Sequence, residues 1–202
     1  MVLTTMMAYP LSRPHLTFRK FYNVLILITM FFSGGLIPTF LTVRNLGLYD
    51  TVWAIVLPGA ISTWNLIIMR TFFMNLPVEL EESAQLDGAN DLTIFSRIIL
   101  PLSKASIATI TLFYAVSHWN NWFNAMIYFK SSKSYPLQTI LRSIVINNEM
   151  SEEMQVDEVI DSVSAEGIKY STLVVSMVPM LVVYPFIQKY FVKGVMIGSL
   201  KG

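Results

Sequence analysis

The chain has 202 residues, of which 54% are apolar and only 13% charged, and its formal net charge is +1. Soluble domains carry roughly twice that share of charged residues, and here the apolar residues stand in long blocks instead of helical stripes. Both features argue against a soluble all-helical protein. The small net charge gives no sign of a polybasic surface for nucleic acid. The absence of cysteine excludes disulfides, thiolate zinc sites and cysteine nucleophiles.

Four apolar blocks are long enough to cross a membrane as helices. A span needs about 20 residues to cross roughly 30 Å of hydrocarbon at about 1.5 Å per residue, whereas a membrane barrel shows shorter segments of alternating polarity. The charged residues inside the blocks are Arg70 and Lys189, which stand near block ends and can reach the headgroups. The predicted spans are residues 21–43, 51–73, 105–129 and 170–192.

Glycine and proline interrupt three of these spans. Ser33-Gly34-Gly35 and Pro38 stand in the first, Pro58-Gly59 in the second, and Pro179 and Pro185 in the last. In a membrane, neighbouring helices or water must satisfy the backbone groups that such residues free. Two explanations stay open: close helix packing through small residues, or hinges that let helices rock around a pathway.

The distribution of lysine and arginine predicts the orientation. With a cytoplasmic N-terminus, nine basic residues lie inside and five outside. The nine are Arg13, Arg19, Lys20, Arg70, Arg97, Lys104, Lys189, Lys193 and Lys201; the five are Arg44, Lys130, Lys133, Arg142 and Lys169. We therefore expect both chain ends and residues 74–104 in the cytoplasm, and residues 130–169 outside.

The first residues are apolar but too few to span a membrane. They lack the basic start of a signal peptide. We therefore expect residues 1–12 to be the end of a preceding membrane helix, and the chain to be a truncated form of a longer protein.

The polar segment 74–104 is predicted to begin with a short helix. Asn75 fits a cap and Pro77 a first helical turn. Residues 78–86 are mostly good helix formers. Three carboxylates stand early, where the helix dipole favours negative charge: Glu79, Glu81 and Glu82. Gly88 is expected to end the helix in the left-handed conformation.

A second short helix is predicted after this turn. Asn90 or Asp91 can cap its first turn. Leu92, Phe95 and Ile99 are expected to form one apolar stripe. The result is a rigid helix–turn–helix with a mixed acidic and apolar surface. It fits a protein partner better than the headgroups, because interfacial helices usually carry Lys and Arg.

The spacing of this segment resembles a known signature. The order Glu-x-Ala, three residues, Gly, nine residues, Ile-x-Leu-Pro resembles the cytoplasmic loop of permease subunits of binding-protein-dependent ABC importers. It falls on Glu82, Ala84, Gly88, Ile98, Leu100 and Pro101. Ser83 stands where the family usually has alanine, a small-for-small difference.

The wider sequence resembles carbohydrate-importer permeases related to the maltose permease subunits, in the lipoprotein and polysaccharide-import branch. The likeness covers essentially the whole chain and is carried by residues 30–38, residues 65–73, His118-Trp119-Asn120 and Lys193-Gly194-Val195. It implies an all-α, polytopic ABC type I importer fold with six spans, of which four are present. Residues 13–202 would form this transmembrane domain in a bacterial plasma membrane, with residues 8–13 resembling the exit of the second helix.

The resemblance also implies the partners. They are ABC ATPase subunits, a second homologous permease, an extracytoplasmic solute-binding protein and the lipid bilayer, with no nucleic acid. Residues 77–101 are expected to dock on the ATPase and couple its closure to opening of the path. The expected contact residues are Glu82, Ser83, Ala84, Asp87, Gly88, Leu92, Phe95, Ile98, Leu100 and Pro101. Glu82 either meets a basic residue of the ATPase or is a solvated charge.

No Gly-x-x-x-x-Gly-Lys-Ser/Thr loop occurs in the sequence. We therefore expect neither enzymatic activity nor a cofactor, with ATP used by a partner subunit.

The third predicted span holds a polar and aromatic cluster: His118, Trp119, Asn120 and Asn121. Tryptophan suits an interfacial belt or helix packing, and asparagines can bond between helices. Aromatic and amide groups also suit a sugar ring and its hydroxyls. The cluster is therefore a candidate lining of the translocation path, with packing as the alternative.

Residues 130–169 form a long acidic connector, which by resemblance contacts the solute-binding protein. A secondary carrier or channel also fits four spans, although only His118 offers an ionisable group within them. An intramembrane hydrolase would need a serine paired with His118, and no nucleophile turn is recognisable.

Overall fold

The computed structural model describes residues 1–153, 167 and 170–185. Every regular element within these residues is helical, as the sequence predicts. The chain divides into two compact units. Among the described residues, unit 1 comprises Met1–Thr39 and Pro58–Tyr114, and unit 2 comprises Phe40–Leu57 and those that follow Tyr114.

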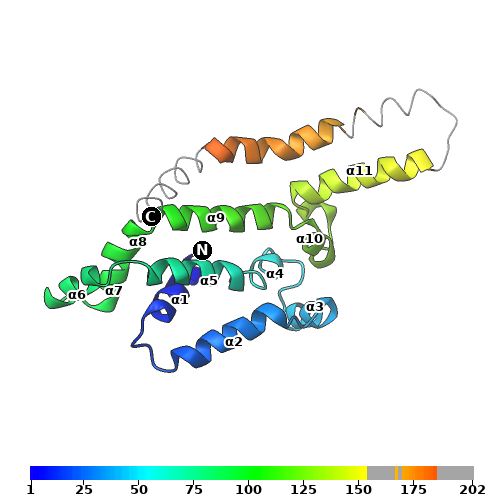
Figure 1. Cartoon of the computed structure of the whole chain (residues 1–202). Helices are drawn as coiled ribbons and strands as arrows, with labels where there is room; N and C mark the ends of the chain where they lie inside the picture. The colour runs from blue at the N-terminus through cyan, green and yellow to red at the C-terminus, as the bar shows by residue number, and fades with distance from the viewer. Residues whose placement is uncertain (154–166, 168–169, 186–202) are drawn as a thin grey trace. The chain divides into compact units, whose positions relative to one another are not determined.

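Unit 1 is built on α1 (Val2–Ser12), which packs against α5 (Thr63–Met74) (Figure 1). The centre of this contact consists of Leu66, Met69 and Phe73 from α5, each at most 2% exposed. Ala8 and Leu11 of α1 cover them. The hydroxyl of Tyr114 accepts a hydrogen bond from the Ser62 amide at 2.8 Å, at the start of α5. The core of unit 1 also includes Ala84, Ile94 and Ile99, which belong to the segment that follows α5.

The remaining elements of unit 1 follow in chain order. They are α2 (Arg19–Phe31), α6 (Glu79–Leu86), α7 (Asp91–Ile94), a π-helical turn η1 (Phe95–Ile99), α8 (Leu100–Leu102) and the first part of α9 (Lys104–Trp119). Helix α2 buries none of its residues and exposes large apolar side chains. An apolar helix exposed in this way is typical of a surface that lipid or another subunit covers.

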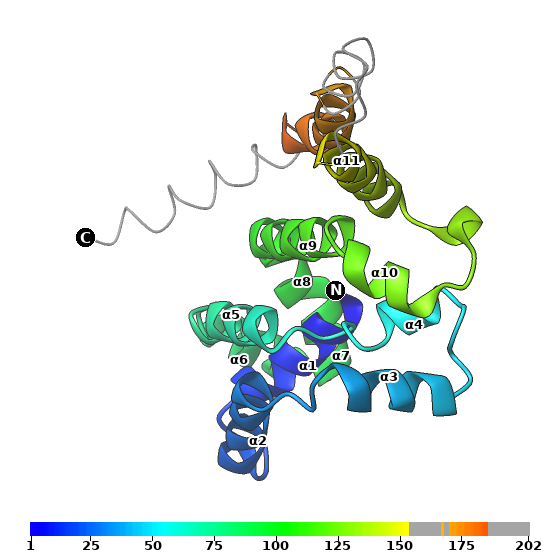
Figure 2. The same cartoon turned by 90° about the vertical axis from the view of Figure 1, so that its right-hand side faces the viewer.

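Unit 2 contains α4 (Trp53–Val56), which lies beside α10 (Trp122–Tyr128), as Figure 2 shows. Val43, Ala54 and Tyr128 form its small apolar core. The ring of Phe40, in α3 (Leu36–Asn45), stacks on Tyr128 with centroids 6.0 Å apart. A short 3-10 turn η2 (Ser132–Ser134), α11 (Leu137–Glu153) and a helix at Tyr170–Pro185 complete the described part of this unit.

Three of the four predicted spans are broken helices. In the described part of the chain no single helix has the length and apolar character to cross a membrane, but two bent pairs meet the test together. These pairs are α2 with α3, bent by 112°, and Asp91–Leu102 with α9, bent by 80°. The expected break at Ser33–Gly35 is confirmed, and Gly35 there has a φ of +85°.

Other boundaries differ from the prediction. The second span has a continuous helix only from Thr63, because Pro58-Gly59 lies in a non-helical stretch before it. The third is interrupted at residues 120–121, which the sequence analysis missed. In the fourth, Pro179 lies within a continuous helix and does not break it. Residues 186–192 of that span lie outside the described residues.

The start of the chain and the segment 130–169 were also predicted from the sequence. Residues 1–12 were expected to end a helix, and α1 ends at Ser12. Residues 130–169 were expected to be a connector, but α11 occupies much of the described part of it. The sequence analysis did not use the signal that was present: Leu137, Ile140, Leu141 and Ile144 stand at the i, i+3, i+4, i+7 spacing of an amphipathic helix.

Candidate functional site

The predicted helix–turn–helix is present between α5 and α9. Helix α6 begins at Glu79, directly after Val78. Asn75 does not cap it: this residue ends α5, where its amide donates to the Phe72 carbonyl at 3.1 Å. The position of Asn75 follows from α5 continuing one residue beyond the predicted span, to Met74. Pro77 then separates the two helices.

Gly88 makes the turn that the sequence predicts. Its φ of +80° lies in the left-handed region. The Gly88 amide donates to the Gln85 carbonyl at 3.0 Å, and the Ala89 amide donates to the Ala84 carbonyl at 2.9 Å. This pair of hydrogen bonds is a Schellman motif, which satisfies the last carbonyls of a helix. The direction of the chain after α6 therefore depends on a conformation that glycine adopts without strain.

The second helix begins as expected but buries a different face. The Asn90 side chain accepts a hydrogen bond from the Thr93 amide at 2.8 Å and caps α7. Ile94 and Ile99 are buried, whereas Leu92 is 72% exposed. The predicted stripe of Leu92, Phe95 and Ile99 is therefore wrong at its first position.

The reason is the π-helical turn at Phe95–Ile99. A π turn adds one residue to the helical repeat, so side chains five apart share a face. Pro101 stands two residues after this turn and has no amide hydrogen, and its ring would clash with the fourth preceding carbonyl in a regular helix. The widened turn relieves this conflict. The Ser103 hydroxyl donates a hydrogen bond to the carbonyl of Ile99, the last residue of the π turn, at 2.6 Å.

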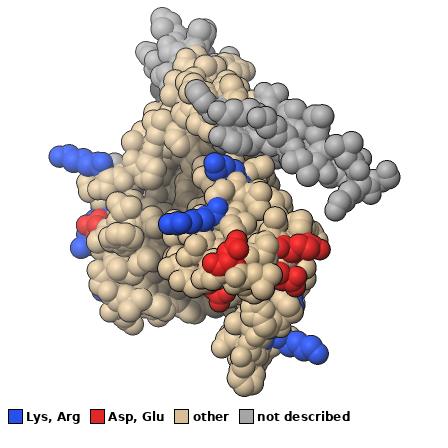
Figure 3. All heavy atoms as spheres, turned by 90° about the vertical axis from the view of Figure 1, so that its left-hand side faces the viewer, with Lys and Arg blue, Asp and Glu red and all other residues tan. Residues whose placement is uncertain are grey.

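The residues predicted to contact the ATPase divide by exposure. Glu82, Ser83, Asp87, Gly88, Leu92 and Pro101 are exposed; Phe95, Ile98 and Leu100 are half-buried; Ala84 is buried. Ala84 therefore supports α6 from below and does not form part of its outer surface. Carboxylates gather on the surface of this segment, as Figure 3 shows, and the exposed ones are Glu79, Glu82, Asp87 and Asp91.

Beside these charges, α6 presents an apolar residue that the sequence analysis did not select. Leu86 is 90% exposed at the end of the helix, next to the Gly88 turn. Leu92 follows just after the turn and is exposed as well. The outer surface of the helix–turn–helix thus combines two leucines with carboxylates.

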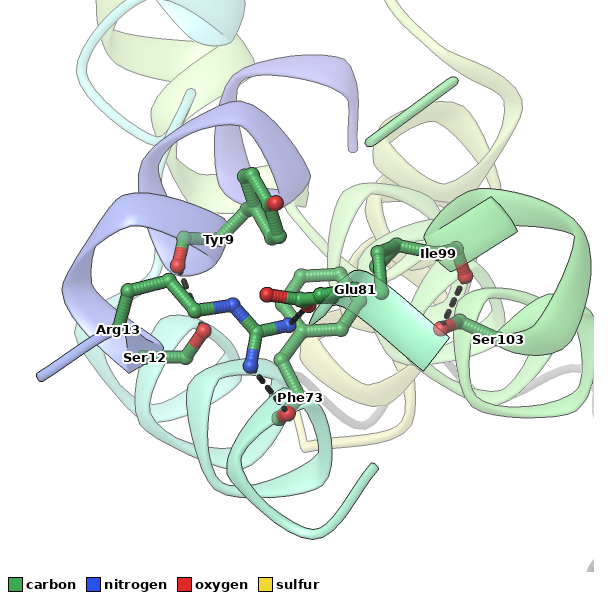
Figure 4. A network of polar contacts seen from close by, with 7 residues as sticks. All are labelled: Tyr9, Ser12, Arg13, Phe73, Glu81, Ile99 and Ser103. Atoms are coloured by element: carbon green, nitrogen blue, oxygen red, sulfur yellow. Dashed lines mark hydrogen bonds and ion pairs between the residues drawn. The ribbon is translucent and has the colours of Figure 1, made fainter. Parts of the chain in front are cut away.

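A buried ion pair joins this segment to α1. The Arg13 guanidinium contacts the Glu81 carboxylate, and the two residues are 7% and 5% exposed. Arg13 also donates to the Phe73 carbonyl at 3.5 Å and lies over the Tyr9 ring, 4.9 Å from its centroid (Figure 4). Burial raises the pKa of the Glu81 carboxyl above its ordinary value, and the Arg13 charge acts against that shift.

The sequence analysis missed this pair because it selected the neighbouring Glu82. One signal was present: Glu81 and Ala84 are three residues apart and therefore share one face of α6. Nothing in the sequence indicated that Arg13 reaches that face. A cavity of about 370 Å³ lies against the pair, between α1, α6, α7 and η1.

The second candidate site lies at the end of α9. Trp119 and Asn121 are half-buried, while His118 and Asn120 are exposed. The helix ends here, and the Trp122 amide donates to the Asn120 carbonyl at 2.9 Å. Trp119 and Asn120 line a cavity of about 380 Å³ together with residues of α11 and the helix Tyr170–Pro185. His118 and Asn121 are not among the lining residues of that cavity.

Among the described residues, no cluster of three or more His, Asp or Glu side chains is placed to bind a metal ion.

Comparison with known proteins identifies the family. Residues 1–197 match the binding-protein-dependent transport system inner membrane components. The chain is 50% identical, over all of its length and 71% of the relative, to the polygalacturonan/rhamnogalacturonan transport system permease protein YtcP of Bacillus subtilis (strain 168). It is 48% identical to Protein LplC of the same organism, over 98% of this chain and 68% of that protein.

The fold agrees with a solved structure. A bacterial ABC transporter involved in the import of the acidic polysaccharide alginate contains a chain with 35% identity and a TM-score of 0.79, covering 94% of this chain and 69% of that one. These matches favour an ABC importer permease over the secondary carrier, channel and intramembrane hydrolase considered from the sequence. The chain belongs to the family of binding-protein-dependent transport system inner membrane components, the membrane-embedded permeases of ABC importers.

Proposed function

We propose that this permease forms part of the translocation path for oligosaccharides that contain uronic acids. The observation that carries the proposal is the 50% identity to a permease named for polygalacturonan and rhamnogalacturonan transport. The structural relative belongs to a transporter of alginate, also an acidic polysaccharide. Both names point to chains of sugars that bear carboxylates.

The helix–turn–helix is the proposed contact with the ATPase subunit. Its outer surface carries exposed carboxylates and two exposed leucines, Leu86 and Leu92. A patch of this kind, apolar with a charged rim, is typical of a protein interface. Glu82 is exposed and therefore free to meet a basic residue of a partner, as its place in the signature implies. The buried face of the same segment connects it to α1 and α5.

The remaining parts of the transporter are proposed from the family. They are a second permease, an extracytoplasmic solute-binding protein and ATPase subunits that use ATP. The segment 77–101 and both chain ends are placed in the cytoplasm, in line with the distribution of Lys and Arg.

The decisive experiment is reconstitution of the complete transporter in proteoliposomes. We expect ATP-dependent uptake of radiolabelled trigalacturonate that requires the binding protein, and labelling of a Glu82→Cys variant by a membrane-impermeant reagent only from the ATPase side. Uptake of neutral maltotriose without uptake of trigalacturonate would contradict the substrate class. Labelling from the opposite side would contradict the proposed orientation.

Leu86 tests the contact surface. Replacing Leu86 with serine is expected to weaken binding of the ATPase subunit roughly tenfold, because burying a leucine contributes about 1.5–3 kcal/mol. Its exposure means that the substitution leaves the core of unit 1 intact. Titrating the purified ATPase onto the permease complex measures the effect.

Leu102→Ser serves as the matched control, since Leu102 is also an exposed leucine but lies in α8, outside the segment 77–101. Equal affinity of Leu86→Ser and wild type would show that this end of α6 does not face the ATPase.

A further inference from the structure

Unit 2 holds two neighbouring cavities. The larger, of about 380 Å³, lies between the end of α9, the start of α11 and the helix Tyr170–Pro185. The smaller, of about 200 Å³, is lined by α10, α11 and the same last helix. Gln138 and Ser176 line both, so the cavities adjoin. The larger falls within the range of about 300–1,000 Å³ that is usual for small-molecule sites.

The larger cavity has the chemistry of a sugar-ring site. Trp119 and Tyr184 supply aromatic surface, against which the C–H face of a pyranose can pack. Asn120 and Gln138 supply amide groups for its hydroxyls. Met177, Met180 and Leu181 complete the apolar lining. A binding site for a small organic molecule usually has this composition, with a few polar groups in a mainly apolar lining.

One of these polar atoms is unsatisfied. The Oε1 atom of Gln138 is buried and has no hydrogen-bond partner among the described residues. Buried polar atoms nearly always have a partner, because leaving one unpaired costs about 1–3 kcal/mol. Ser176 donates its hydroxyl to the Leu173 carbonyl at 2.7 Å, which leaves its oxygen able to accept a hydrogen bond. The Ser176 oxygen can thus accept from a hydroxyl of a ligand in the adjoining cavities, and rotation of the Gln138 amide toward the cavities that it lines would let its Oε1 atom accept from one as well.

The smaller cavity adds a positive charge. The Arg142 guanidinium lies 3.8 Å from the centre of the Trp122 ring, and both residues line the cavity. Stacking on an aromatic ring holds a guanidinium in place while leaving its N–H groups available at the edge. No ion pair joins Arg142 to a carboxylate whose side chain the structure describes. A planar guanidinium binds a carboxylate through two parallel hydrogen bonds.

From this arrangement we infer that the adjoining cavities form a subsite for one uronate residue, with Arg142 binding its carboxylate and Gln138 accepting from a ring hydroxyl. The inference rests on the proposed function and assigns a location to the charge recognition that an acidic oligosaccharide requires. Two residues of this subsite, Trp119 and Asn120, were candidates from the sequence. The other polar residues, Gln138, Ser176 and Arg142, were not selected by the sequence analysis.

Arg142→Gln tests the charge. In the complete reconstituted transporter, initial uptake rates are measured for trigalacturonate and for its methyl ester, which lacks the charges. We expect Arg142→Gln to lower the acid-to-ester ratio about fivefold, as for a partly exposed ion pair, and Arg142→Lys to keep most of it. Lys133→Gln is the control, because Lys133 is exposed and does not line either cavity. An unchanged ratio in Arg142→Gln, or an equal fall in Lys133→Gln, would overturn the assignment.

Gln138→Leu tests the shared hydrogen bond. It is expected to slow uptake of the acid and the ester alike, about fivefold, because both substrates carry the hydroxyl. Co-purification of the ATPase monitors assembly of each variant. Normal uptake of both sugars by Gln138→Leu would contradict the subsite. If the wild-type transporter imports neither sugar, the proposed function fails and the subsite with it.

A photoreactive residue identifies the occupant directly. With p-benzoylphenylalanine at Met180, which lines the larger cavity, we expect crosslinking to labelled trigalacturonate. The same probe at Val174, an exposed residue of that helix outside both cavities, is expected to give none. Crosslinking of the Met180 probe to the second permease without any sugar adduct would show that a protein helix fills the cavity, and would overturn the inference.

Discussion

Replacing Gly88 with valine is expected to abolish stimulation of ATP hydrolysis by the loaded binding protein, while the permease still inserts in the membrane. Gly88 has a φ of +80°, and apart from Gly88 and its two chain neighbours no residue has an atom within 4 Å of the place where a Cβ would stand. The effect is therefore conformational and not a clash. A β-branched side chain is a clear outlier in the left-handed region, so the chain would leave the Schellman motif and α7 would change direction relative to α6. Measuring ATPase activity in proteoliposomes tests this.

Gly88→Asn is the matched control for conformation. Asparagine has a side chain but tolerates the left-handed region far better than valine does. It should retain most of the stimulation, because the space around Gly88 is open. Wild-type stimulation in Gly88→Val would refute the idea that this turn transmits the movement of the ATPase. Equal loss in both variants would show that any side chain at this position blocks docking.

Breaking the Arg13–Glu81 pair is expected to have the second large effect. Both residues are buried, and removing one partner leaves the other charge without compensation, which costs about 3–5 kcal/mol. We expect Glu81→Gln and Arg13→Gln each to reduce stimulated ATPase activity at least tenfold and to increase proteolysis of residues 74–104 in the purified permease. The ion pair holds α6 against α1, so its loss should free α6 from the core before the rest of unit 1 unfolds.

The double variant Arg13→Glu/Glu81→Arg separates the pair from its individual residues. The exchanged charges can form the same ion pair, although Arg13 would lose its stacking on Tyr9 and its bond to the Phe73 carbonyl. We expect partial recovery of activity relative to either single reversal. Glu82→Gln is the control for charge alone, since that neighbour is exposed. It should leave protection from proteolysis unchanged, and equal protease sensitivity of Glu81→Gln and Glu82→Gln would contradict the proposed role.

Local signals predicted the course of the candidate coupling segment well. Gly88 at the end of α6 and Asn90 at the start of α7 act through hydrogen bonds within a few residues. The glutamates at the start of α6 stand where the helix dipole favours negative charge. Such effects are encoded in neighbouring residues. The boundary at Asn75 was wrong because the helix before it runs on, and helix ends are the least reliable part of a pattern.

Periodicity failed where the helical repeat changes. The stripe of Leu92, Phe95 and Ile99 assumed 3.6 residues per turn, whereas Phe95–Ile99 is a π turn. Leu92 consequently faces outward and Ile94 inward. Pro101 was a visible warning, but a proline can be accommodated by a kink or a break as well as by a π turn.

The amino-acid sequence alone determined the helical class and the turn that directs α7, because these depend on composition and on short spacings. It also carried the resemblance to the membrane-permease family, which extends over nearly the whole chain. Only the tertiary structure decided which glutamate is buried, since Glu81 and Glu82 differ just in the face of α6 that they occupy. It also decided that Arg13 is the partner of Glu81, and that Gln138, Ser176 and Trp119 line one cavity. Such contacts join residues far apart along the chain, and no local spacing records them.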